Sequence, residues 1–345
     1  MGKKYLTIFS IFIATAIVGY FLVPTINEVN TDSNEPKLVT PISEFPNNGD
    51  ENYISNIAST QVNSNFSYLL EHRGAFILKY DTEGNFVQKI GRPGRGPGEL
   101  INPLDFAIDN DRIYTLEQGK MQIQEFDENG NYTDTYFFHG AYMGLLKLKD
   151  GFLLKNYYYD GMPEYSDMPD FGNYPLFTYF DPTLDSAFSF GKYPAFFEQL
   201  DINHSGSFSD VHDGFVYTGF RGFPYVQVLD SKGNIENEIY LKGDGLEKIL
   251  EMYLYNPSES YPSLFLDMKV NEHGIFMSSY GEELELFHFN FDGDLKNKYT
   301  IKKDDPNDRY IKTFDIINSG SRNQLTLFAT VHGLNIRTLI AQIDI

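Results

Sequence analysis

Residues 104–138 read LDFAIDNDRIYTLEQGKMQIQEFDENGNYTDTYFF. Apolar and polar side chains alternate along four short runs, and the residues between the runs are those typical of tight turns. The runs cover residues 104–109, 112–118, 121–127 and 132–138. Such alternation predicts β-strands, and the short connections predict that the four strands form one antiparallel sheet.

The turn before the last of these strands recurs along the chain. Asp, two further residues and Gly separate alternating runs at YDTEGNF (80–86), FDENGNY (126–132) and LDSKGNI (229–235), and a degraded copy is FNFDGDL (289–295). In such a hairpin the Asp side chain accepts hydrogen bonds from its own turn, and the Gly takes a positive φ. We therefore assign structural roles to Asp81, Gly84, Asp127, Gly130, Asp230 and Gly233.

The spacing of these glycines sets a period. Gly84 and Gly130 are 46 residues apart, and 60 residues separate Gly233 from Gly293. The 103 residues between Gly130 and Gly233 hold two units, because FDPTLDS (180–186) keeps the aspartate of the turn and replaces its glycine with Leu. Four-stranded units repeated at this spacing indicate a β-propeller, whereas a two-sheet sandwich predicts no such period.

The two ends of the chain complete the count. The last unit stops at Ile345 without a fourth strand, and KLVTPISEF (37–45) is a strand with no unit of its own. If that strand fills the gap, the ring closes with six blades. The expected fold is all-β, a six-bladed propeller of four-stranded antiparallel blades whose last blade is closed by the N-terminal strand, preceded by one N-terminal hydrophobic helix.

The N-terminus carries a hydrophobic segment. Lys3 and Lys4 precede an uncharged run over residues 5–23, which as a helix would span roughly 27 Å and so nearly a bilayer core. The positive flank predicts a cytoplasmic N-terminus and an extracytoplasmic remainder, in the periplasm or cell envelope. The expected domains are an anchor or signal segment (1–24), a tether (25–36) and the propeller (37–345). Cleavage after the small-residue pattern at 14–16 is the alternative, and it would give a secreted protein.

Composition removes several classes of function. The chain has no cysteine, which excludes disulfides, thiolate nucleophiles and cysteine-bound zinc. Its formal net charge is −21, and this repels a phosphate backbone, so no nucleic acid is expected as a partner.

The linker IGRPGRGPGEL (90–100), followed by the unit quoted first, resembles the NHL-type repeat and its six-bladed relatives of Bacteroidetes. The likeness is closest over the first two units, where a Gly-rich linker precedes Pro, an inner strand, a short Asp/Asn turn and the Asp-x-x-Gly turn. The resemblance implies an extracytoplasmic propeller and supplies no catalytic residues. A phosphate-binding loop is disfavoured, because the glycines precede a strand and lack the Lys-Ser/Thr of a P-loop.

Long segments fall on one face of the expected disc. Strand directions alternate, so the inter-blade linkers and the second turn of each blade share a face, and these connections are the long ones. They are GRPGRGPGELINP (91–103) and residues 160–174, 192–206 and 242–262, with a short helix expected at LEKILEMYL (246–254). Loops longer than a connection requires are where binding usually resides.

Two groups of side chains on that face are candidate ligand contacts. Guanidinium groups bind carboxylates or sulfates, although they can equally pair with neighbouring acids; the candidates are Arg73, Arg92, Arg95 and Arg221. Aromatic rings offer stacking surfaces for sugars or peptides, although they can equally anchor the loops; the candidates are Tyr157, Tyr158, Tyr159, Tyr174, Phe196 and Phe197.

The histidines do not recur at equivalent inner-strand positions, so no metal site is assigned, and calcium through Asp or Asn oxygens stays open. No Ser-His-Asp order or carboxylate pair stands out, and catalytic residues are unknown. We expect a binding module for an envelope protein, peptide or glycan on the long-loop face. The alternatives are a propeller enzyme (lactonase, lyase or glycan-acting hydrolase) with a divalent metal in the channel, and an architectural part of an envelope complex.

Overall fold

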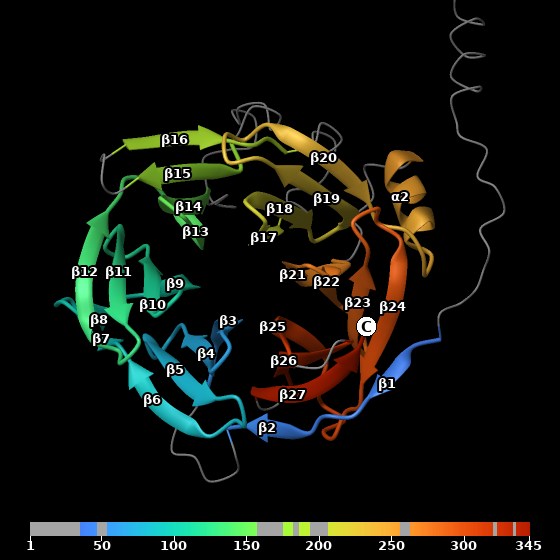
Figure 1. Ribbon diagram of the computed structural model, residues 1–345, viewed down its shortest axis with the longest axis horizontal. Coiled ribbons are helices and arrows are strands. Elements are labelled where there is room, and N and C mark those ends of the chain that lie inside the picture. The colour runs from blue at the N-terminus through green and yellow to red at the C-terminus, as the bar shows by residue number, and fades with distance from the viewer. Residues whose placement is uncertain are drawn as a thin grey trace, which may run out of the picture. The chain divides into compact units, whose positions relative to one another are not determined.

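The computed structural model describes residues 35–46, 54–156, 175–181, 186–193, 206–255, 263–319, 323–333 and 336–345. Six β-sheets stand around a central axis, each with four antiparallel strands and the first of these nearest the centre (Figure 1). The chain therefore forms the six-bladed β-propeller that the turn period predicts. The hydrophobic segment at residues 5–23 and the tether up to residue 34 lie outside the described residues, and no described helix is long and apolar enough to cross a membrane.

Each of the first four blades uses consecutive strands, ordered from the axis outward. Blade one contains β3 (Ile57–Val62), β4 (Phe66–Glu71), β5 (Phe76–Asp81) and β6 (Phe86–Ile90). Blade two contains β9 (Pro103–Asp109), β10 (Arg112–Glu117), β11 (Gln122–Asp127) and β12 (Tyr132–Phe137). Blade three contains β13 (Tyr142–Leu148), β14 (Gly151–Asn156), β15 (Phe177–Asp181) and β16 (Ser186–Phe190). Blade four contains β17 (Ser207–His212), β18 (Phe215–Phe220), β19 (Phe223–Leu229) and β20 (Ile235–Tyr240).

The last two blades involve the N-terminal strands. Blade five contains β21 (Phe265–Asn271), β22 (Gly274–Ser279), β23 (Leu284–Phe289) and β24 (Leu295–Ile301). Blade six contains β25 (Tyr310–Asn318), β26 (Gln324–His332) and β27 (Arg337–Asp344). The short β7 (Arg92–Pro93) and β8 (Glu99–Leu100) pair in the linker between blades one and two, and the expected helix is α2 (Leu246–Tyr255).

Closure of the ring differs in one respect from the expected single strand over residues 37–45. The outer strand of blade six is β2 (Ser43–Phe45), antiparallel to β27, whereas β1 (Lys37–Val39) is a fifth, parallel strand on blade five beside β24. Pro41 lies between them, and proline cannot donate to a strand ladder. The N-terminal chain thus crosses from one blade to the next and ties both.

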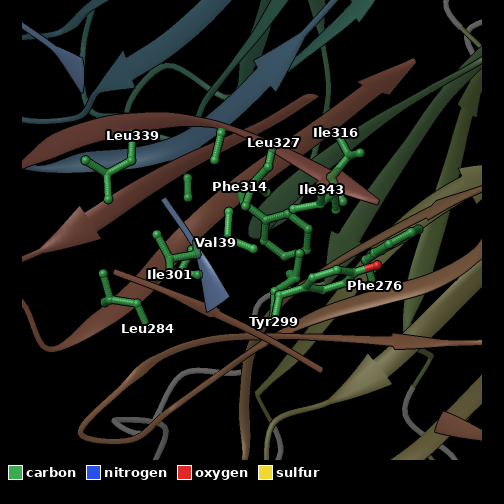
Figure 2. Close-up of a cluster of buried hydrophobic side chains, with 14 of the residues drawn as sticks. Val39, Phe276, Leu284, Tyr299, Ile301, Phe314, Ile316, Leu327, Leu339 and Ile343 are labelled. Atoms are coloured by element: carbon green, nitrogen blue, oxygen red, sulfur yellow. The ribbon is translucent and has the colours of Figure 1, made fainter. Parts of the chain in front are cut away.

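Apolar layers between neighbouring blades hold the ring together. The layer between blades five and six contains Phe276 and Tyr299 on one side and Phe314 and Leu327 on the other, all fully buried (Figure 2). Val39 of β1 packs into the same layer. Because the N-terminal strand adds both backbone pairing and apolar contact here, it stabilises the junction where the ring begins and ends.

The Asp-x-x-Gly hairpins have the geometry that their residues predict. In blade one, Asp81 Oδ1 accepts the backbone N–H groups of Glu83 (3.0 Å) and Asn85 (2.8 Å), and Gly84 has a φ of 88°. Asp127 with Gly130 and Asp230 with Gly233 repeat the pattern. In blade five Asn290 takes the place of the aspartate and Gly293 that of the glycine.

Candidate binding site at the channel mouth

The inner strands give the channel two different ends. All six first strands begin at the linker face, which we define as the end where the linkers and the β4–β5, β10–β11 and β18–β19 turns lie; they run toward the hairpin face, where their own first turns lie. A cavity of about 390 Å³ occupies the linker end of the channel. A second cavity, of about 340 Å³, lies at the hairpin face between the first turns of blades one and two and is lined by no cationic side chain.

Aspartates on four inner strands connect neighbouring blades. In each, Oδ1 accepts the N–H of the following residue and Oδ2 accepts an N–H from the next blade. The inter-blade bonds are Leu145 N to Asp105 (2.9 Å), Val270 N to Asp210 (2.7 Å), Phe314 N to Asp267 (3.1 Å) and Val62 N to Asp315 (2.7 Å). Gln61 does the same between blades one and two, where its Oε1 accepts the N–H of Ile108 (3.0 Å). We call these side chains the inter-blade acceptors.

Lys269 of β21 supplies a positive charge among the four aspartates. Desolvation lowers its pKa, but the combined field of the four carboxylates outweighs this and raises the pKa above its ordinary value. Burial in turn raises the pKa of Asp315 to about 6, against the opposing effect of Lys269. The channel wall therefore holds an ionic array of one lysine among four aspartates, and this array serves the closure of the ring.

The junction between blades three and four is built differently. Its inner strand β13 supplies no inter-blade aspartate, and the contact is made instead by Lys155 at the end of β14, whose Nζ donates to the backbone carbonyl of Ser207. Gly144 makes room for this lysine, since a Cβ at residue 144 would lie 3.1 Å from the Cβ of Lys155. At this one junction a cation replaces the carboxylate.

Two further cations converge on the same cavity. Arg221, in the β18–β19 turn, and Lys312, near the start of β25, both line it together with Lys155. We call these three residues the cation cluster. Burial lowers the pKa of Lys155 to about 8, and the neighbouring Arg221 acts in the same direction. Burial and Arg221 also lower the pKa of Lys312. Burial is the larger cause of both shifts, and nearby acids act against it: Asp105 and Asp267 raise the pKa of Lys155, and Glu71 raises that of Lys312.

The local acids are already engaged elsewhere. Glu71, almost fully buried, accepts the backbone N–H of Asn56 (2.8 Å) and the hydroxyl of Ser55 (2.6 Å), and it thereby positions Asn56, whose Oδ1 accepts a hydrogen bond from Lys312 Nζ (2.9 Å). Within the described part of the chain, no carboxylate forms an ion pair with any member of the cation cluster. Asp105 and Asp267 also line the cavity, and their carboxylates accept backbone N–H groups without pairing with these cations.

Aromatic rings continue the wall beside the cation cluster. Tyr310 lines the cavity and stacks on His332, with ring centroids 5.1 Å apart and planes 3° apart. Tyr280, at the end of β22, lies 5.2 Å from Tyr310 and is 54% exposed. Burial and the nearby charges of Lys312 and Arg309 lower the pKa of His332, which favours the neutral form of this ring.

The structure separates the four candidate arginines. Arg221 lines the cavity, whereas Arg73 is exposed in the β4–β5 turn and does not line it. Arg92 lies in β7 at the rim of the ring and pairs with Glu99 at 3.1 Å, and Arg95 is exposed in the same linker (Figure 1). A ligand role for each of them stays a prediction, and only Arg221 is placed beside other cations of the channel.

The candidate aromatic residues of the long loops lie outside the described residues, and they include Tyr158, Tyr174 and Phe197. Among the residues that are described, no group of three His, Asp or Glu side chains is placed to hold a metal ion. The inter-blade aspartates use both carboxylate oxygens for backbone N–H groups, which makes them poor candidates for calcium ligands.

Sequence reasoning missed Lys155, Lys312 and Tyr310. One usable signal was present, because an Asp followed by an apolar residue recurs in the inner strands as LDF, SDV, LDM and FDI. This repeat identifies side chains that face the channel. It is absent from the inner strand of blade one, where Gln61 takes the same role, and from that of blade three, where the exceptional junction lies. No local pattern marks Lys155, whose electrostatic environment is formed by residues of blades two, four and five.

Comparisons with known proteins agree with the fold. Residues 48–217 match the family model DUF5128, described as a 6-bladed β-propeller. A member of the DUF4221 family from Bacteroides vulgatus is similar with a TM-score of 0.61 and 14% identity over 90% of this chain and 98% of that one. A protein from Bacteroides fragilis named as exported gives 0.56 and 14% over 92% and 98%.

A streptogramin B lyase structure gives a TM-score of 0.51 and 14% identity over 87% of this chain and 97% of that one. At these identities the likeness is one of fold. No curated protein matches the sequence. The chain is thus a six-bladed β-propeller of the kind found in Bacteroides proteins, and its residues 48–217 match the DUF5128 family.

Proposed function

We propose that this protein is a binding module that holds an anionic ligand in the linker end of its channel. The observation that carries the proposal is the convergence of Lys155, Arg221 and Lys312 on one cavity of about 390 Å³, with no ion-pair partner among the described residues. A cavity of this size accommodates a small molecule or one unit of a larger one. Carboxylate groups are the natural partners for the guanidinium and ammonium donors.

The net charge of the protein limits the class of anion that we expect the cavity to bind. A net charge of −21 repels polyanions of high charge density, so the surface as a whole opposes their approach. The cation cluster, which lines the cavity, is a local exception to this charge. This combination supports a ligand with one or a few acidic groups and disfavours nucleic acid or a densely sulfated polymer.

An extracytoplasmic location is part of the proposal. It is supported by the positive flank and hydrophobic run at the N-terminus, and by the similarity in fold to a Bacteroides fragilis protein that is named as exported. Retention of residues 5–23 as an anchor would hold the propeller at the membrane, and cleavage would release it. Mass spectrometry of the mature N-terminus, together with fractionation of cells, distinguishes the two.

The binding test uses citrate, a small carboxylate with no flat ring. Calorimetric titration at low ionic strength should give a dissociation constant in the millimolar range or tighter, on the order of 4 kcal/mol of binding free energy or more. The double variant Lys155→Met/Lys312→Met should weaken it at least tenfold. Lys89→Met/Lys232→Met, which removes two exposed lysines far from the cavity, is the matched control and should stay within twofold. An equal loss of citrate affinity in the two double variants would contradict the proposal.

A lyase is the second candidate, and the lowered pKa of Lys155 favours it. With a pKa of about 8, a substantial fraction of this lysine is neutral near pH 7.5 and can act as a general base. In a β-elimination, Lys155 would take the proton next to the carboxylate, the electron pair would form a C=C bond, and the leaving group would depart from the adjacent carbon. Arg221 and Lys312 would stabilise the developing charge.

Product formation separates these two candidates. A lyase acting on a carboxylated substrate creates a C=C bond conjugated with the carboxylate, which absorbs in the ultraviolet. A slow rise in absorbance that Lys155→Met abolishes, while Lys89→Met leaves it unchanged, would assign the enzyme. Stable binding without any new absorbance would assign the binding module.

A further inference from the structure

We infer that the ligand of this cavity is an acidic sugar, a uronic acid or a glycan that contains one. The inference rests on the proposed function and adds to it the class of molecule that carries the acidic group. The geometry that points to it is a set of three rings in contact, which we call the aromatic wall: Tyr310 lines the cavity beside the cation cluster, His332 stacks on it, and Tyr280 beside it is 54% exposed.

The rings and the cations belong to one site. Arg221 contributes to the electrostatic environment of both Lys155 and Tyr310, and Lys312 contributes to that of His332. Tyr310 and Lys312 both come from β25 and both line the cavity, and Lys312 lies at a β-bulge of that strand. A ligand that places its carboxylate among the cations therefore has its carbon skeleton beside the aromatic wall.

A sugar ring matches this pairing of surfaces. The flat face of a pyranose presents C–H groups to an aromatic ring, while its edge carries hydroxyl groups that need polar partners. The cavity offers the hydroxyl groups of Ser59 and Ser207 and the amide of Gln61 beside the cations. A hydroxyl group both donates and accepts, so these side chains can bond a sugar hydroxyl in addition to their existing partners.

A peptide fits the site less well, because its usual mode of binding to a sheet is blocked. Extended peptides add to a sheet by bonding the free backbone groups of an edge strand. Along the channel, the inter-blade acceptors already occupy backbone N–H groups of five inner strands, at Val62, Ile108, Leu145, Val270 and Phe314. The channel edge is therefore poorly suited to strand addition, and recognition is left to side chains.

Three probes with equal carbon number test the inference in the full protein. D-Glucuronate carries both the ring and the carboxylate, D-glucose the ring alone, and hexanoate the carboxylate alone. Calorimetric titration should show glucuronate binding at least tenfold more tightly than either of the others. Tyr280→Ala should weaken glucuronate at least threefold and leave hexanoate unchanged, because Tyr280 is exposed and contributes only its ring face.

Tyr310 gives the sharper variant pair. Tyr310→Ala should lower glucuronate affinity at least fivefold, whereas Tyr310→Phe, which keeps the ring, should stay within twofold; thermal melting checks that both variants fold. Tyr132→Ala, at an exposed ring on the outer strand of blade two, is the control and should change nothing.

The possible results distinguish a failure of the acidic-sugar inference from a failure of the proposed anion site. Equal affinity for glucuronate and hexanoate, unaffected by the tyrosine variants, would overturn the acidic-sugar inference and leave the anion site standing. Tighter binding of a short acidic peptide, such as Asp-Asp-Asp, than of glucuronate would also overturn it. Failure of citrate, glucuronate and hexanoate alike would remove the proposed function itself.

Discussion

The four aspartate junctions and the lysine junction all connect neighbouring blades, but the aspartates accept hydrogen bonds there and Lys155 donates one. At the aspartate junctions, each carboxylate is consumed by backbone N–H groups of its own and the next blade. Between blades three and four, Lys155 makes one bond across the junction and retains two donors. Both carboxylate oxygens of each aspartate are thus occupied by contacts that close the ring, whereas Lys155 keeps donors that can bind a ligand.

The largest expected effect is on stability at an aspartate junction. Asp267→Ala removes the acceptor of Thr313 Oγ1 (2.9 Å) and Phe314 N (3.1 Å) and deprives Lys269 of one counter-charge. We expect a loss of about 2 to 3 kcal/mol in the free energy of unfolding, measured by urea denaturation. Asp267→Asn keeps one acceptor and should lose less than half of that. Asp304→Ala, at an exposed aspartate, is the control. An equally large loss of unfolding free energy in this control would contradict a special role for Asp267.

At the lysine junction the expected effect falls on binding and not on stability. Lys155→Met keeps the shape of the side chain and removes a charge that burial disfavours, so the free energy of unfolding should change by less than about 1 kcal/mol. Affinity for citrate should fall at least tenfold in the same variant. A variant that loses stability as Asp267→Ala does, with citrate affinity intact, would make Lys155 one more structural contact.

The pH dependence of binding follows from the same lysine. A depressed pKa of about 8 means that Lys155 is charged below pH 8 and neutral above it. Affinity for citrate should therefore fall by up to about tenfold between pH 7 and pH 9, since one charged contact is lost. Lys155→Met should flatten most of this profile. The pKa of Lys312 is also lowered by burial. An unchanged affinity across this range in the native protein would contradict a role for Lys155.

The smallest expected effect lies at the outer hairpins, far from the channel. Asp81→Ala should cost about 1 kcal/mol, because two turn N–H groups lose their acceptor at a site that water can reach. Asp81→Asn should cost less, since Asn290 performs the same task in blade five. Citrate affinity should not change in either variant. A measurable change would show that the hairpin face and the linker face are coupled.

Much of the fold was predictable because its signals are local. The Asp-x-x-Gly hairpin is specified within seven residues, and its repetition gives the number of blades without knowledge of any long-range contact. The exception was the N-terminal strand, where sequence reasoning joined β1 and β2 into one element. Pro41 marks the break, but which blade each half pairs with depends on partners about 260 to 300 residues away.

The candidate site was predictable only as a face. Loop length indicated the linker face as the binding side, which stays a prediction; the cavity lined by cations lies at that end of the channel, and Arg221 was among the residues named for it. Arg92 was a reasonable candidate by residue type, yet it pairs with Glu99, whose other oxygen accepts the N–H of Gly96, so the linker compensates its own charge. Lys155 and Lys312 come from blades three and six and line one cavity only in the closed ring, so no spacing along the sequence predicts that they do.

The central claim is that the linker end of the channel binds an anion through the cation cluster. Calorimetric titration of citrate into the native protein, Lys155→Met/Lys312→Met and Lys89→Met/Lys232→Met tests it most directly. We expect the native protein and Lys89→Met/Lys232→Met to bind citrate with dissociation constants within twofold of each other. Lys155→Met/Lys312→Met should bind citrate at least tenfold more weakly. Equal affinity in all three proteins, or equal losses in both variants, would contradict it.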